Sequence, residues 1–131
     1  MPELDAVADP LAHWTKRPCG AIVEERARLE GERTFLYFRD QEISFRQMDE
    51  AANRIANGLA GLGVNKSDEV ALMLPNCPEF IATLFAVGKL GAAEVPLNAA
   101  LKGNSLQYIL NHCDPRVLVL GQEFHKSGRT T

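Results

Sequence analysis

Short hydrophobic runs alternate along the chain with longer segments of helical spacing. The continuous apolar run at residues 70–74 is typical of a strand buried on both faces of a parallel sheet, and residues 93–96 and 116–120 are predicted to form two further short strands. Segments with helical apolar spacing separate them, at residues 78–90 and from residue 104 or 105 onward. The order strand, helix, strand, helix, strand predicts an α/β fold, in which a partial parallel sheet is flanked by helices.

The residues before the first run predict a helix and a hairpin. Ile22, Arg26 and Leu29 lie at helical spacing, and Gly31 is a suitable stop. Residues 34–44 hold two β-rich stretches around a polar turn, which indicates an N-terminal β-hairpin, although the turn has no glycine.

A long amphipathic helix should follow the hairpin. Ser44 and Gln47 have the spacing of a capping box, in which hydroxyl and amide bond each other's backbone N–H groups. Gly63 can adopt the left-handed conformation at the helix end. The apolar positions of this helix are Phe45, Met48, Ala52, Ile55, Leu59 and Leu62.

Three regions are predicted. Residues 1–17 form an irregular lead-in in which Trp14 is the first candidate core residue, residues 18–121 form the α/β unit, and residues 122–131 form a disordered polar tail. A chain of 131 residues with 46% apolar residues can bury a core of its own.

Charge and cysteine content exclude several kinds of protein. Fourteen Lys and Arg stand against 17 Asp and Glu, with no dense basic run, so nucleic acid is not an expected partner. Cys19, Cys77 and Cys113 are odd in number and widely spaced, which predicts reduced thiols in a cytoplasmic protein without a secretory leader. The longest apolar stretch, residues 80–90, is too short for a transmembrane segment.

No segment has the pattern of a phosphate site. Gly58, Gly61 and Gly63 lie at the end of the long helix, where helix termination and close packing explain them. Residues 127–131 (SGRTT) are rich in hydroxyls but have no second glycine and no lysine. Because no G-x-G-x-x-G motif lies between a strand and a helix, a small dinucleotide-binding enzyme is also excluded.

Titratable residues do not gather into a site. His112, Cys113 and Asp114 are adjacent on a helix and point in different directions, and they fit a helix end better than a metal site. His13 and His125 are isolated, and capping or burial is favoured over nucleophilic chemistry for Cys77.

The acidic residues fit structural roles. Asp49-Glu50 is interpreted as a solvated helix face and Asp68-Glu69 as a turn before a strand. Glu94 stands in an apolar run and must reach solvent or a partner, and a structural role at the sheet rim is favoured over catalysis. The sequence therefore predicts no catalytic, cofactor-binding or metal-binding residue in this chain.

An ordered series of short motifs resembles the N-terminal portion of the adenylate-forming acyl-CoA synthetases, which are AMP-binding enzymes. The resemblance covers Cys19 to Gly121, and Glu94 together with Leu101-Lys-Gly103 looks most like the carnitine/crotonobetaine-CoA ligase and fatty acid transport protein branches. The motifs are ISFRQMDE at 43–50, ANRIA at 52–56, LGV at 62–64, DEVAL at 68–72, LPNCPEF at 74–80, KLGA at 89–92 and VPLN at 95–98.

The resemblance implies an ATP-dependent ligase in the full-length parent. That family joins a carboxylate to AMP with release of pyrophosphate and passes the acyl group to coenzyme A, so the parent would use ATP, Mg and CoA. The phosphate loop, the nucleotide motifs and the C-terminal lobe with its catalytic lysine have no counterpart here. Ser67 stands where the family usually has glycine. We expect a scaffold for the substrate-side wall that is inactive alone.

The alternative is a free-standing interaction module without catalysis. Both hypotheses predict exposed apolar surface, because the helix at residues 78–90 and the sheet edges would lack covering layers. We therefore expect the isolated chain to associate with itself, and the remainder of the parent ligase to be its partner.

Overall fold

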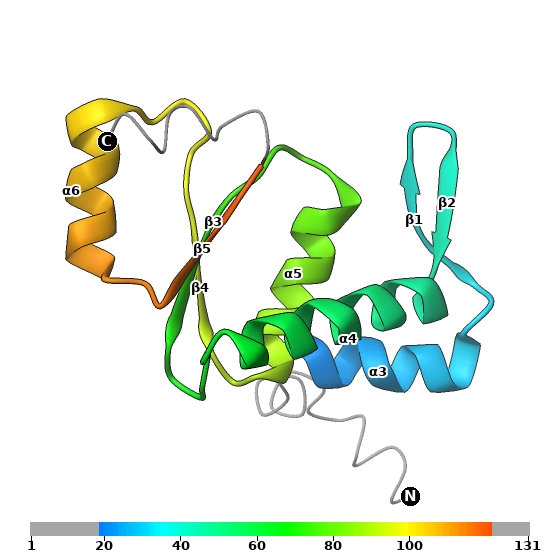
Figure 1. Cartoon of the computed structure of the whole chain (residues 1–131). Coiled ribbons are helices and arrows are strands. Elements are labelled where there is room, and N and C mark those ends of the chain that lie inside the picture. The colour runs from blue at the N-terminus through cyan, green and yellow to red at the C-terminus, as the bar shows by residue number, and fades with distance from the viewer. Residues whose placement is uncertain (1–18, 122–131) are drawn as a thin grey trace, which may run out of the picture.

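The computed structural model describes residues 19–121 (Figure 1). The predictions for the lead-in, Trp14, His13, His125 and the C-terminal tail lie outside these residues. The described elements are α3 (Cys19–Glu30), β1 (Thr34–Phe38), β2 (Gln41–Ser44), α4 (Phe45–Gly61), β3 (Glu69–Met73), α5 (Pro78–Lys89), β4 (Ala93–Pro96), α6 (Gly103–Cys113) and β5 (Val117–Leu120).

The predicted α/β fold is confirmed. The strands β4, β3 and β5 form a parallel sheet in that order, with β3 in the centre. Figure 1 shows α6 on one side of the sheet and α4 and α5 on the other. Among the described helices, none has the length and hydrophobicity that a bilayer-spanning segment needs.

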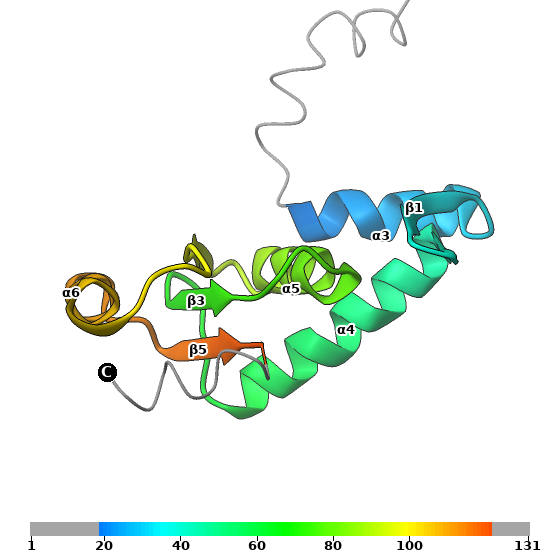
Figure 2. The same ribbon diagram turned by 90° about the horizontal axis from the view of Figure 1, so that it is seen from above.

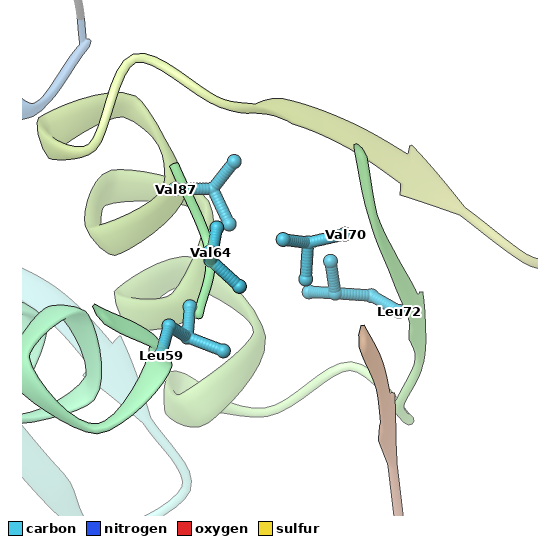
Figure 3. Close-up of a cluster of buried hydrophobic side chains, with 5 residues drawn as sticks. All are labelled: Leu59, Val64, Val70, Leu72 and Val87. Atoms are coloured by element: carbon cyan, nitrogen blue, oxygen red, sulfur yellow. The ribbon is translucent and has the colours of Figure 1, made fainter. Parts of the chain in front are cut away.

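The main core lies between the sheet and the helices α4 and α5 (Figure 3). Val70 and Leu72 of β3 point toward Leu59 of α4 and Val87 of α5, and Val64 lies between Leu59 and Val87. Val70 and Leu72 are fully buried, as a continuous apolar run in a central parallel strand requires. The opposite face of β3 packs with Leu106 of α6 in a second cluster.

The hairpin and the capping box are both confirmed. β1 and β2 pair antiparallel, and Arg39 in the turn adopts the left-handed φ of 53° that a glycine would otherwise supply. Ser44 Oγ accepts from Gln47 N at 3.1 Å, and Gln47 Oε1 accepts from Ser44 N at 2.9 Å. The reciprocal bonds fix the start of α4 directly after the hairpin.

The predicted apolar face of α3 was wrong at one position. Leu29 is 55% exposed, and Val23 is the buried apolar side chain instead. Gly20 determines how the helix packs, because a Cβ there would lie 2.7 Å from the backbone nitrogen of Lys89. The start of α3 therefore rests on the end of α5, and α3 lies against helices rather than against the sheet.

The predicted helix boundaries need small corrections. Leu62 is 65% exposed and forms the C-cap of α4, so it does not belong to the buried face. Gly63 has a φ of 92°, which confirms the left-handed end. The helix α6 begins at Gly103, one or two residues earlier than predicted, and ends at Cys113, with Asp114 as a left-handed C-cap.

Ser67 stands where the family that the sequence resembles usually has glycine, and it has a left-handed φ of 72° in the turn before β3. Its N–H donates to the carbonyl of Gly91 at 3.0 Å, so the turn persists although a Cβ disfavours this conformation. We expect Ser67→Gly to raise the free energy of unfolding by about 0.5–1 kcal/mol in urea denaturation. Ser105→Gly, inside α6, should instead lower it, and equal effects of the two substitutions would contradict the interpretation.

Candidate functional site

The connections that follow β3 and β4 identify the carboxyl edge of the parallel sheet as a candidate site. After β3 the chain enters α5 on one face, and after the neighbouring β4 it enters α6 on the other face. Ligands of open α/β sheets bind in the crevice at the carboxyl ends of strands where successive connections leave to opposite faces. In this protein that place lies between the ends of β3 and β4.

A hollow of about 490 Å³ lies at this place. Sites for small molecules commonly have volumes of this order, a few hundred to a thousand Å³. We call it the strand-end hollow. Its lining residues are Leu74, Pro75, Asn76 and Phe80 from the end of β3 and the start of α5, and Pro96, Leu97, Asn98 and Ala99 from the end of β4.

The polar groups of the strand-end hollow are neutral. Asn76 is exposed, and Asn98 Oδ1 accepts from Ala100 N at 2.9 Å, which holds the loop after β4. Among the described residues that line the hollow, none is a Lys, Arg, Asp or Glu. The hollow therefore suits an apolar or neutral portion of a ligand, whereas a triphosphate with magnesium requires cations, carboxylates or a glycine-rich loop. The described residues that line this hollow do not fit ATP with magnesium.

Sequence reasoning missed both asparagines. A usable signal was present, since each apolar run at residues 70–74 and 93–96 is followed within four residues by an Asn. The carboxyl ends of parallel neighbours meet at one edge, so polar residues that follow two such runs come together.

Cys77 occupies the N-cap position of α5 next to the hollow, but its side chain makes no capping hydrogen bond. Burial raises the pKa of its thiol, so the thiol stays protonated near neutral pH. This agrees with the interpretation of Cys77 as a structural rather than a nucleophilic residue.

Glu94 is half-buried in β4, and burial raises the pKa of its carboxyl. Because the pKa of Glu94 is higher in the folded than in the unfolded chain, ionisation of its carboxyl destabilises the fold when the pH rises above the folded pKa. At low pH the carboxyl is protonated in both the folded and the unfolded chain, and this destabilisation disappears. We expect Glu94→Gln to raise Tm at about pH 7 and to leave it unchanged at about pH 4. Thermal melting of both proteins at the two pH values tests this.

The matched control for Glu94 is Glu50→Gln, because Glu50 is exposed on α4. Its Tm should follow that of the unmodified chain at both pH values. A Tm of Glu94→Gln that is lower at pH 7 would show that the carboxylate has a stabilising partner.

The expectation of a solvated Asp49-Glu50 face was wrong for Asp49. Its carboxylate accepts from Lys89 Nζ at 2.8 Å, and the two side chains are only 16% and 11% exposed. Glu24 Oε1 lies 3.6 Å from the same ammonium but is largely exposed. The pair joins α4 to α5 and has a structural role, remote from the strand-end hollow.

A larger groove, of about 630 Å³, lies between β2, α4 and the start of α5. Met48, Ile55 and Ala82 form part of its apolar floor, and its charged lining residues include three glutamates and Arg54. We favour the smaller strand-end hollow because the connections after β3 and β4 diverge there, whereas, among the described residues, the glutamates of the groove form no cluster that could hold a metal ion.

The remaining candidate residues stay apart from both hollows. Within residues 19–121, no three His, Cys, Asp or Glu side chains are placed to hold a metal ion, and His112 stacks on Tyr108 with ring centroids 6.0 Å apart. Gly58 and Gly61 lie within α4. Asp68 Oδ2 accepts from Asn65 N at 2.7 Å, which confirms a turn, while Glu69 is already part of β3.

The comparisons with known proteins agree with this fold. The sequence model described as AMP-binding enzyme matches residues 23–130. The crotonobetaine/carnitine-CoA ligases of Salmonella paratyphi A and Salmonella typhimurium are 37% identical in an alignment of 107 residues that covers 78% of this chain.

Two solved structures show the same arrangement. The anthranilate CoA ligase AuaEII in complex with anthranoyl-AMP is 34% identical, with a TM-score of 0.81 over 86% of this chain and 22% of that one. The N-terminal domain of FACL13 from Mycobacterium tuberculosis is 30% identical, with a TM-score of 0.80 over 86% of this chain and 29% of that domain.

The chain spans only 21% of the length of the curated relatives, and the similarity lies in their N-terminal portion. The resemblance in the ordered motifs of residues 43–98 is thus confirmed by sequence and by structure. With the family match extending over residues 23–130 of 131, the chain belongs to the AMP-binding enzyme family.

Proposed function

We propose that this chain is the N-terminal part of an ATP-dependent acyl-CoA ligase, in which it forms a section of the substrate-side wall. The relatives named as CoA ligases and the structure solved with an acyl-AMP support this reaction class. In the parent, a carboxylate and ATP would give acyl-AMP and pyrophosphate, and the acyl group would then pass to CoA. The chain alone would not catalyse either step.

The strand-end hollow carries the proposal. It lies where the connections after β3 and β4 diverge, and Leu74, Phe80 and Leu97 make it apolar while Asn76 and Asn98 add neutral hydrogen-bonding groups. Such a lining can hold a neutral or hydrocarbon portion of a substrate. ATP, magnesium and the charged parts of CoA would contact other regions of the parent.

A chimera tests the assignment of the chain. The 131-residue chain replaces the matching residues of the Salmonella typhimurium crotonobetaine/carnitine-CoA ligase. We expect acyl-CoA formation by the chimera and no ATP–pyrophosphate exchange by the chain alone. Exchange activity of the isolated chain would contradict the scaffold role, and an inactive but folded chimera would contradict the ligase assignment.

Two alanines in the loop after β4 test the role of the hollow. Ala99 lines the hollow, whereas its neighbour Ala100 is exposed and outside it. In the chimera, Ala99→Phe should lower kcat/KM at least about tenfold because the ring fills the hollow, a loss of about 1.4 kcal/mol in transition-state stabilisation. Ala100→Phe should leave kcat/KM within about twofold. Equal effects of the two substitutions would place the substrate elsewhere.

The interaction module remains the second candidate, and self-association remains a prediction. Among residues 19–121, the large exposed hydrophobic residues lie on four separate segments of the chain. They are Leu29, Tyr37, Leu62 and Tyr108. Light scattering on the isolated chain tests association directly. The widely spaced cysteines support a cytoplasmic location for the proposed ligase.

A further inference from the structure

The two outer edges of the sheet differ in their hydrogen-bonding groups. Leu97 N donates to the carbonyl of Leu72 at 2.7 Å, so Leu72 and, by alternation, Val70 direct their backbone groups toward β4. Their partners in the parallel register are Pro96 and Glu94, which therefore direct their backbone groups away from the sheet. Proline has no N–H, so the outer edge of β4 offers a single donor, beside a carboxylate.

The outer edge of β5 has no such protection. Gly121 N donates to the carbonyl of Met73 at 2.9 Å, so Met73 and Ala71 direct their backbone groups toward β5. Their partners Leu120 and Leu118 direct theirs away from the sheet. Neither is a proline, and β5 contains no charged residue, although edge strands are usually blocked by such features.

The side chains of β5 pack on both faces of the sheet, as those of an interior strand do. Val117 and Val119 pack into the cluster on the side of α4 and α5, while Leu118 and Leu120 pack into the cluster under α6. A strand that is apolar on both faces normally has a neighbour on each side. Within residues 19–121, β5 has only β3 beside it, and Figure 2 shows it at the edge of the sheet.

We propose that the outer edge of β5, and not that of β4, is where a strand from the rest of the ligase continues this sheet. The inference rests on the proposed function and names the partner surface. The matching part of the FACL13 N-terminal domain is 29% of that domain, so more than two thirds of a single domain must pack around the matched region. The unblocked edge is where such a domain can extend its hydrogen bonding.

Hydrogen exchange on the unmodified chain tests the proposal. The binding partner in this experiment, called the complement, is the Salmonella typhimurium ligase from which the segment that aligns with this chain has been removed. The removed segment of that enzyme serves as the positive control. We expect the complement to slow exchange at the amides of Leu118 and Leu120 at least about tenfold. The amide of Glu94 should exchange at the same rate with and without the complement.

A pair of variants at one position isolates the backbone donor. Leu120→Ala removes the side chain and keeps the N–H, whereas Leu120→Pro removes both. Leu120→Ala should bind the complement within about threefold of the unmodified chain, and Leu120→Pro should bind at least about tenfold more weakly. Glu94→Pro, at the other edge, should bind unchanged, and retained protection of the β3 amides shows that each variant is folded.

Several results would overturn the proposal. The proposal would be wrong if the complement bound and slowed hydrogen exchange at the amide of Glu94 while the amides of Leu118 and Leu120 still exchanged freely. Another such result is equal binding by Leu120→Pro and Leu120→Ala. A chain that is already a dimer joined at β5, and that the complement does not separate, would make a second copy the occupant. A chain that does not bind while the control segment does would contradict the ligase assignment itself.

Discussion

Replacing Lys89 by alanine should lower the free energy of unfolding by about 3–5 kcal/mol, because it leaves a largely buried carboxylate without its partner. Lys89 Nζ donates to Asp49 Oδ1 at 2.8 Å across residues forty positions apart in sequence. The side chains are only 11% and 16% exposed, so water hydrates little of the carboxylate that has lost its ammonium partner. Urea denaturation followed by circular dichroism measures the loss.

Two further variants separate the buried pair from its surroundings. Glu24 lies 3.6 Å from the same ammonium but is 64% exposed, so Glu24→Ala should change the free energy of unfolding by less than about 1 kcal/mol. The double variant Asp49→Leu with Lys89→Met removes both charges and should lose less than Lys89→Ala alone. If Lys89→Ala cost no more than Glu24→Ala, the Asp49 carboxylate would be hydrated and the pair would not hold the helices together.

Local sequence patterns predicted the helices and strands, but they could not predict contacts between residues that are distant in the sequence. The apolar run at 70–74 and the Ser44–Gln47 spacing depend on neighbouring residues, and strand and capping box both appear in the structure. Asp49 was interpreted as solvated because its partner, Lys89, lies on another helix forty positions away, where no local pattern shows it. Periodicity also overestimated the apolar faces at helix ends, where Leu29 and Leu62 turn toward solvent.

The strand-end hollow illustrates the same limit. Each asparagine that lines it follows a recognisable apolar run, but the sequence does not state which strands are neighbours. The pairing of β3 with β4, and the departure of their connections to opposite faces, bring Asn76 and Asn98 to one hollow. The family resemblance supplied the reaction class, whereas the location of the hollow required the sheet order.

Leu72→Ala should lower the free energy of unfolding by about 2–5 kcal/mol, since it creates a cavity in the central strand. Leu72 is fully buried and packs with Leu59 and Val87 on the face that α4 and α5 cover. Its carbonyl also accepts from Leu97 N at 2.7 Å, so the same residue ties β4 to β3 beside the strand-end hollow. Urea denaturation of the purified variant measures the change.

Leu62→Ala is the matched control for Leu72→Ala, because it deletes the same atoms from a side chain that is 65% exposed. It should change the free energy of unfolding by less than about 0.5 kcal/mol. A small loss at Leu72 together with an unchanged denaturant slope would mean that the neighbouring side chains close the cavity. A comparable loss at both leucines would contradict the assignment of the core to the space between β3, α4 and α5, because the two substitutions delete the same atoms from a buried and from an exposed side chain.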